Sequence, residues 1–185
     1  MVKKPRTLHS LSSATWIAAG GLHNIAVMTN GQVYSWGCND DGGVGRDTSQ
    51  KAVDAGTATP DYMPATVDFP KDTPVTGLGT AAGDCQSVLT DTEGRIWVWG
   101  SYKDKEGKPI RDAPTPAGVR GKNDSPYLVR TGLDEEGGVK AVSVCCGASF
   151  NAARTSDGKI ITWGLGECGE LARPVKPIKV GEEVR

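Results

Sequence analysis

One short pattern occurs three times along the chain, at nearly equal spacing. In each copy a glycine ends a stretch of small residues, a second glycine follows 11 residues later, and a tryptophan follows 5 residues after that. The first glycines are Gly20, Gly83 and Gly147, the second are Gly31, Gly94 and Gly158, and the tryptophans are Trp36, Trp99 and Trp163. The spacing between these three residues is the same in every copy, although the two spacers that separate the copies are long and dissimilar. The sequence therefore predicts one structural unit repeated in series.

Each copy predicts an antiparallel hairpin. Polar turns such as Asn30-Gly31 and Asp157-Gly158 supply the positive φ angles that tight hairpin turns need. The returning strand alternates with a period of two, as in residues 96–99, and its β-branched and aromatic residues suit a half-buried strand. We therefore expect the three tryptophans to pack in the core rather than to form a site.

The spacers predict the remaining strands of each unit. Residues 62–67 include Pro64 and suit an edge strand, and residues 126–130 are their counterpart in the second spacer. About four short strands per repeat make one blade of a β-propeller, which closes with about four to eight blades. The expected fold is all-β, an incomplete propeller of about three blades. We expect a piece of a larger propeller, or a chain whose partner is the missing remainder.

The divisions predicted within this single partial propeller domain follow the repeat. They are a flexible basic lead at 1–13, a first repeat at 14–77, a second at 78–140 and a truncated third at 141–185. The lead is basic between Lys3 and Arg6, and it suits a solvated terminus, a nuclear address, or a weak contact with nucleosomal phosphate or histones.

Composition argues against several classes of function. The 185 residues carry a net charge of −1, which gives no strong attraction to nucleic acid or membrane, and there is no run of about 18 apolar residues. The five cysteines lack C-x-x-C spacing, which argues against structural zinc and favours a reducing compartment inside the cell. No nucleophile elbow or phosphate-binding glycine loop occurs. We therefore expect no catalytic residues, no metal and no cofactor or nucleotide site.

The repeat resembles that of the regulator-of-chromosome-condensation family. The signature A-A-G-x-x-H followed by G-x-V-Y-x-W-G stands at residues 18–23 and 31–37. The spacers at 37–48, 100–107 and 164–171 resemble loops of the founding branch, the nuclear exchange factor for the small GTPase Ran. The resemblance runs from about Trp16 to Arg173 and implies a seven-bladed propeller in the full family fold.

What this resemblance implies is guanine-nucleotide exchange on a Ran-type small GTPase in the nucleus. Such a factor is regulatory rather than a covalent catalyst. It binds the nucleotide-free GTPase better than the loaded form, so the nucleotide leaves faster. Acidic loop residues suit this task, because they could compete for the GTPase's phosphate-coordinating lysine or disturb its magnesium site.

The resemblance also singles out candidate contact residues. Asp104 matches the acid of the family's G-S-[FY]-[KR]-D loop, with Lys103 before it, and either contacts the GTPase or caps a turn. Asp40 and Asp41 match an acidic loop pair, and Asp84 matches the acid of the second hairpin. His23, which matches the hairpin histidine, is expected to pack and hydrogen-bond rather than to bind a ligand.

Three departures from the family pattern support an alternative. Ser149 stands where the family has an aspartate that is important for exchange, Cys85-Gln86 replaces Ser-His, and residues 171–173 replace L-G-R. The alternative is a non-catalytic interaction propeller, such as a scaffold or an adaptor for a ubiquitin ligase or chromatin.

Overall fold

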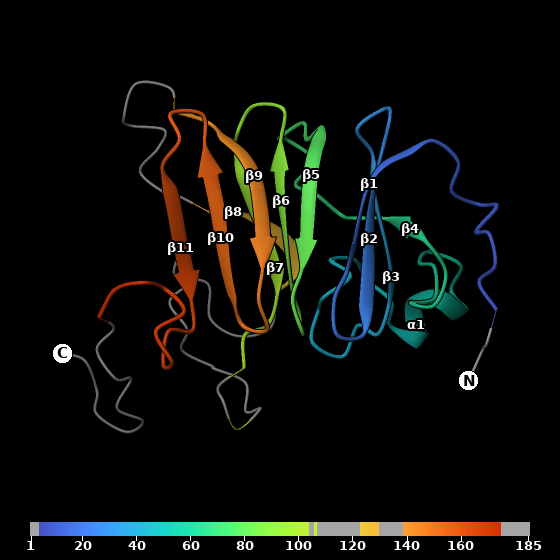
Figure 1. The fold of residues 1–185 in the computed structure, drawn as a ribbon. Coiled ribbons are helices and arrows are strands. Elements are labelled where there is room, and N and C mark those ends of the chain that lie inside the picture. The colour runs from blue at the N-terminus through green and yellow to red at the C-terminus, as the bar shows by residue number, and fades with distance from the viewer. Residues whose placement is uncertain (1–3, 104–105, 107–122, 130–138, 175–185) are drawn as a thin grey trace.

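The fold is almost entirely β (Figure 1). The computed structural model describes residues 4–103, 106, 123–129 and 139–174. Within these ranges there is one short helix, α1 (Gln50–Asp54), and no helix is long and apolar enough to cross a membrane. The prediction of an all-β chain with three sheets of propeller type is confirmed.

The strands form three antiparallel sheets. In the first sheet the order is β1 (Ala14–Ala19), β2 (His23–Met28), β3 (Val33–Gly37) and β4 (Ala65–Thr66). In the second it is β5 (Gly77–Ala82), β6 (Gln86–Asp91), β7 (Ile96–Gly100) and β8 (Asn123–Val129). The third sheet contains β9 (Ala141–Cys146), β10 (Phe150–Thr155) and β11 (Ile160–Gly164). The spacers thus supply the edge strands β4 and β8, as predicted.

The three hairpins share one register, which confirms the hairpin prediction. Gly31, Gly94 and Gly158 have φ angles of 78°, 80° and 85°, a region that favours glycine over residues with a Cβ. In each sheet the tryptophan pairs with the second residue of the preceding strand: Trp36 with Asn24, Trp99 with Ser87 and Trp163 with Asn151. Consequently, side chains at equivalent positions point to the same side of their own sheet.

The sheets pack face to face, and the core lies between them. One apolar cluster joins the first and second sheets, and it includes Ile25, Val27, Leu89, Trp97 and Trp99. A second cluster joins the second and third sheets, and it includes Val88, Ile96, Val98, Val144 and Ala153. Fully burying one such side chain contributes about 1.5–3 kcal/mol. The second sheet contributes to both clusters, so it is the best-packed of the three.

Equivalent tryptophans differ in burial because their neighbours differ. Trp99 is fully buried between the first and second sheets, and the ring centroid of Phe69 lies 5.5 Å from that of Trp97 and 6.0 Å from that of Trp99, in edge-to-face arrangements. Trp163 is partly buried against the cluster between the second and third sheets. Trp36 is partly buried on the side of the first sheet that faces no other described sheet. The prediction that these tryptophans pack in the core therefore holds fully only for Trp99.

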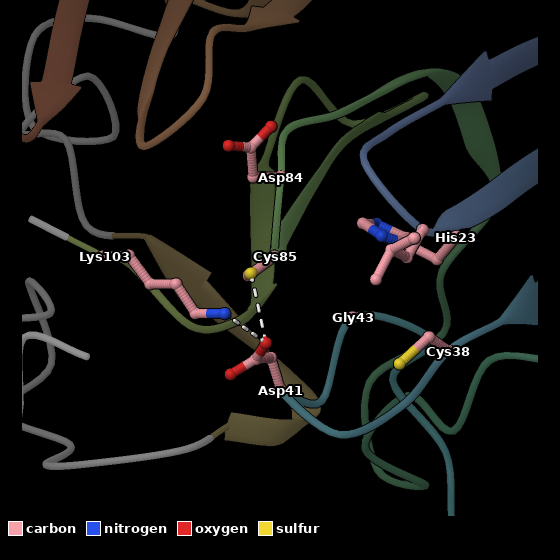
Figure 2. A pocket seen from close by; sticks show the side chains of 8 residues that line it. His23, Cys38, Asp41, Gly43, Asp84, Cys85 and Lys103 are labelled. Carbon is pink, nitrogen blue, oxygen red and sulfur yellow. Dashed lines mark hydrogen bonds and ion pairs between the residues drawn. The ribbon is translucent and has the colours of Figure 1, made fainter. Parts of the chain in front are cut away.

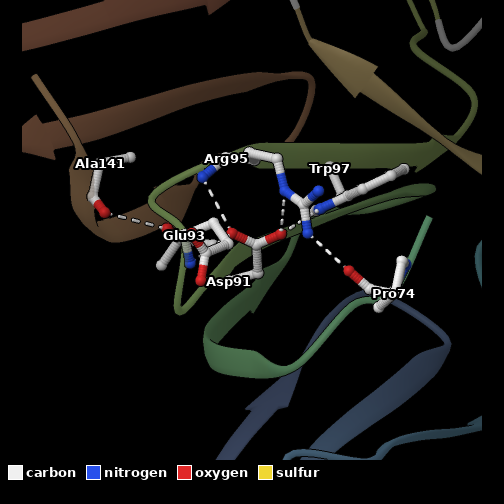
Figure 3. Close-up of polar contacts among 7 residues, drawn as sticks. Pro74, Asp91, Glu93, Arg95, Trp97 and Ala141 are labelled. Carbon is white, nitrogen blue, oxygen red and sulfur yellow. Dashed lines mark hydrogen bonds and ion pairs between the residues drawn. The ribbon is translucent and has the colours of Figure 1, made fainter. Parts of the chain in front are cut away.

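A buried carboxylate fixes the turn of the second hairpin (Figure 3). Asp91 is completely buried, and one of its oxygens accepts hydrogen bonds from the backbone N–H groups of Glu93 (3.0 Å) and Arg95 (2.9 Å). The other oxygen accepts from Arg95 Nε (2.7 Å) and Trp97 Nε1 (2.8 Å). Arg95 also donates to the Pro74 carbonyl at 2.6 Å, so the network connects the turn to the segment that enters the second sheet.

We predict that Asp91→Ala lowers the free energy of unfolding by about 3 kcal/mol, because it leaves the buried Trp97 N–H without an acceptor and removes the carboxylate partner of Arg95. Urea denaturation followed by tryptophan fluorescence measures this change. Glu93→Ala is the matched control, since Glu93 is an exposed carboxylate in the same turn, and we expect a change below about 0.5 kcal/mol. Equal midpoints for the two variants would contradict the assignment.

Candidate functional site

A hollow lies between the first and second sheets, at the end of the strands where each hairpin begins and closes (Figure 2). His23 pairs with Gly37 and Gln86 pairs with Gly100, so the turns before β2 and β6 lie beside the segments after β3 and β7. We call this end of the first and second sheets, where the turns before β2 and β6 meet the segments after β3 and β7, the loop end. The hollow is lined by Leu22, His23, Cys38, Asp41, Gly43, Asp84, Cys85 and Lys103.

The second sheet holds the loop at residues 38–48 in place. The Gly43 carbonyl accepts hydrogen bonds from Ser87 Oγ (2.7 Å) and from Trp99 Nε1 (2.8 Å). Ser101 Oγ donates to the Asp41 carbonyl at 2.9 Å. A Cβ at Gly43 would lie only 3.1 Å from the His23 ring, so glycine permits the close approach. The loop that carries Asp40 and Asp41 is therefore positioned by the neighbouring sheet.

His23 supports this loop from inside. It is buried, and its Nε2 lies 2.8 Å from Ser87 Oγ. The single hydroxyl proton of Ser87 goes to Gly43, so the neutral tautomer with Nε2–H donates to Ser87. Burial lowers the pKa of His23, against a smaller opposing contribution from the backbone of Gln86. His23 packs and hydrogen-bonds, as predicted.

Asp41 connects the two sheets across the hollow. Its Oδ2 accepts hydrogen bonds from Lys103 Nζ at 2.8 Å and from the Cys85 thiol at 3.1 Å. The hydrogen bond with Asp41 is the main reason that the pKa of Lys103 is raised. Burial, followed by the Asp41 contact, raises the pKa of Cys85, so this thiol stays protonated at neutral pH. Both charged side chains are about 30% exposed, so the pair contributes at most about 1 kcal/mol.

Among the other predicted acids, Asp84 and Asp40 are exposed to solvent. Figure 2 shows the Asp84 carboxylate pointing away from the cluster of Asp41, Cys85 and Lys103. The Asp84 backbone N–H donates to the Ala148 carbonyl at 3.0 Å, which fixes the turn while the side chain remains exposed. Asp40 is exposed on the 38–48 loop. Asp104 lies outside the described residues.

The structure thus brings Asp41, Asp84 and Lys103 to one hollow, and it adds residues that sequence reasoning did not place there. Cys85 contacts Asp41, and Leu22 protrudes beside the hollow with 73% of its surface exposed. Ser149, from the third sheet, is buried and accepts a hydrogen bond from the Lys103 backbone N–H at 3.1 Å. Leu22 could have been found from its place in the turn between the marker glycine and His23. No group of three or more metal-binding side chains occurs among the described residues.

Two models of the regulator of chromosome condensation (RCC1) repeat match the chain. One matches residues 17–42 and 141–170, and the other matches residues 30–88. Together they cover just over half of the sequence, in all three sheets.

Similar proteins cover most of the chain. The Drosophila melanogaster "Regulator of chromosome condensation" is 32% identical over 171 residues, which are 92% of this chain and 27% of that protein. The human "E3 ubiquitin-protein ligase HERC2" is 27% identical over 170 residues, or 91% of this chain and 3% of that protein. The structure of Prp20p from Saccharomyces cerevisiae matches with a TM-score of 0.67 and 26% identity over 86% of this chain and 34% of that one. The chain thus spans about a third or less of these proteins.

We predict that stability falls as the pH is lowered from about 7.5 to about 5.5, and that His23 causes much of the fall. The unfolded chain takes up a proton near the ordinary histidine pKa of about 6.5, whereas buried His23 does not until lower pH. His23→Gln preserves an amide donor for Ser87 and removes the titration, so we expect a clearly flatter profile. Urea denaturation at several pH values measures both proteins, and parallel profiles would contradict the prediction.

Proposed function

Because this chain belongs to the regulator of chromosome condensation (RCC1) repeat family, we propose that its loop end binds a Ran-type small GTPase and accelerates release of the bound guanine nucleotide. The chain is about a third as long as the family relatives, so the proposal concerns the surface that these residues contribute. By the same family membership, we propose a nuclear location.

The observation that carries the proposal is the pair of carboxylates at the hollow. Asp41 and Asp84 come from loops of neighbouring sheets, and the backbone of each is held by the next sheet: the Asp41 carbonyl accepts from Ser101 Oγ and the Asp84 N–H donates to the Ala148 carbonyl. A rigid surface loses little entropy when it binds, and the exposed Leu22 beside it provides an apolar anchor. We therefore assign the GTPase contact to Asp84 and Asp41 with Leu22. Asp40 and Lys103 are at its margin, and Asp104 stays a candidate on the family resemblance alone.

No covalent chemistry is required of these residues. A carboxylate that reaches the GTPase's phosphate-binding lysine or its magnesium site interacts more strongly when the nucleotide is absent. Binding that favours the empty form over the loaded form weakens nucleotide affinity by the same factor, because the coupling is reciprocal. Exchange would follow from this difference in affinity.

The similar proteins give further support. The structure of Prp20p is described together with its binding to Gsp1p and histones, so a propeller of this type has both a protein partner and a chromatin partner. For this chain, a chromatin contact would use the exposed Lys4 and Arg6 in the N-terminal lead. This contact is a secondary part of the proposal, because two positive charges supply little binding energy at physiological salt.

The test is release of a fluorescent guanine nucleotide from Ran in the presence of this chain. We expect Asp84→Asn to reduce the acceleration about tenfold, the equivalent of about 1.4 kcal/mol of contact energy. Asp72→Asn is the matched control. Asp72 is also exposed but stands two residues from Pro74, at the opposite end of the second sheet. Equal rates for the two variants would remove Asp84 from the contact.

A second candidate function is a non-catalytic interaction propeller. Ser149 supports it, because at the family's acidic position this chain has a buried hydroxyl that is engaged with the Lys103 backbone. The similarity to an E3 ubiquitin-protein ligase is consistent with an adaptor role. Partner capture from nuclear extract, with no acceleration of nucleotide release by folded protein at micromolar concentration, would favour this function over exchange.

A further inference from the structure

Three side chains from different segments meet at one carboxylate oxygen in the hollow (Figure 2). Asp41 Oδ2 accepts a hydrogen bond from Lys103 Nζ at 2.8 Å and another from the Cys85 thiol at 3.1 Å. The Lys103 and Asp41 side chains are 30% and 31% exposed, so water and a partner can reach both. A partner that binds the hollow therefore meets Asp41 with a cation already paired to it.

The backbone is fixed on both sides of this ion pair. Ser101 Oγ donates to the Asp41 carbonyl at 2.9 Å, and the Lys103 N–H donates to the hydroxyl oxygen of buried Ser149 at 3.1 Å. Between these anchors, the Lys103 ammonium is carried by a flexible four-carbon stem. The ammonium can therefore leave Asp41 by side-chain rotation alone, while both loops keep their places.

Lys103 sets the charge of the hollow. Among the residues that line it, Asp41 and Asp84 are carboxylates and Lys103 is an ammonium, which leaves one net negative charge. His23 and Cys85 add no charge at neutral pH, because burial lowers the pKa of His23 and raises the pKa of Cys85. Without the Lys103 ammonium, the negative charge of the hollow would double.

We propose that Lys103 is a displaceable counter-ion that masks Asp41 and thereby determines which partners the hollow accepts. A partner gains a contact with Asp41 only if it presents a cation of its own that takes the place of the Lys103 ammonium. The exchange replaces one ion pair by another, so it adds little to affinity and serves selection. A partner without a well-placed cation leaves the pair of Lys103 and Asp41 intact and gains nothing from Asp41.

On the proposed function, on which this step rests, the partner's cation is the phosphate-binding lysine of the GTPase. In the loaded GTPase that lysine already binds the phosphates of the nucleotide. In the empty GTPase it has lost them, so the empty form is the one that can displace the Lys103 ammonium. Lys103 thus acts through Asp41, and it favours the form of the GTPase that exchange requires.

The first test needs no GTPase. It compares how fast a positively charged and a negatively charged methanethiosulfonate of similar size modify Cys85 in the folded chain, with each cysteine followed by peptide mass spectrometry. Both reagents react with the same thiolate, so the ratio of their rates cancels any change in the thiol pKa and reports the local charge. Cys145, which is exposed on the third sheet, is the internal reference.

We expect Lys103→Met, which keeps an unbranched stem and removes the charge, to shift the Cys85 ratio about tenfold towards the cationic reagent. A nearby unit charge changes each rate severalfold in opposite directions, and the two changes multiply. Lys103→Arg should keep the wild-type ratio, and Asp41→Asn should shift the ratio the other way. Lys71→Met is the matched control, because Lys71 is exposed three residues before Pro74, at the opposite end of the second sheet. An unchanged ratio for Lys103→Met would overturn the proposal.

The second test measures the affinity of the same variants for nucleotide-free Ran, after circular dichroism has confirmed that each variant folds. Lys103→Met should bind about fivefold more tightly, because the partner no longer has to displace an ammonium. Lys103→Arg and Lys71→Met should match the wild type. In an Asp41→Asn background the gain from Lys103→Met should fall below about twofold, since Lys103 acts through Asp41. Weaker binding by Lys103→Met would overturn the proposal, because Lys103 would then contact the partner itself.

The two tests separate the counter-ion from the proposed function. A folded wild-type chain that neither binds Ran nor accelerates nucleotide release would contradict the proposed function and remove the GTPase as the partner. The ratio of the two reagents at Cys85 would still decide whether Lys103 masks Asp41, because that measurement involves no partner.

Discussion

The structure depends on the contact that each sheet makes with the next. At its centre is the Gly43 carbonyl, which receives hydrogen bonds from Ser87 and Trp99 of the following sheet while His23 supports Ser87 from behind. Around it, Leu89 and Trp97 bury apolar surface against Ile25 and Val27. The polar groups are paired and lie next to the apolar cluster, so the contact fixes one geometry as well as supplying stability.

This contact also shapes the candidate site. Asp41 lies in the 38–48 loop, immediately before Gly42 and Gly43, and Lys103 follows β7. The side chains of this ion pair are about 30% exposed and the pair adds little stability, whereas the backbone hydrogen bonds place the loops. The loop end is thus rigid in its backbone and charged at its surface, a combination that lowers the entropic cost of binding a partner.

Serial packing explains why equivalent residues have unlike surroundings. In a repeat array each unit contacts only its neighbours, so its stability is a sum of unit and interface contributions. The second sheet has a neighbour on both sides, and its Ile96, Trp97, Val98 and Trp99 are all buried. The first and third sheets each have one described neighbour. On their remaining faces, positions equivalent to buried ones, such as Ile17 and Ile160, are exposed.

The sequence by itself determined the hairpins, their turns and their shared register. These features depend on local chemistry: glycine at positive φ, a period of two in strands such as residues 96–99, and a phase repeated along the chain. The resemblance to the family also identified Asp41 and Asp84 as candidate contact residues. Tertiary structure decided which equivalent residue is buried, that Asp41 pairs with Lys103 far along the chain, and that Ser149 supports the Lys103 backbone. Such contacts join different sheets, and no local pattern encodes which side chain faces a neighbouring sheet and which faces water.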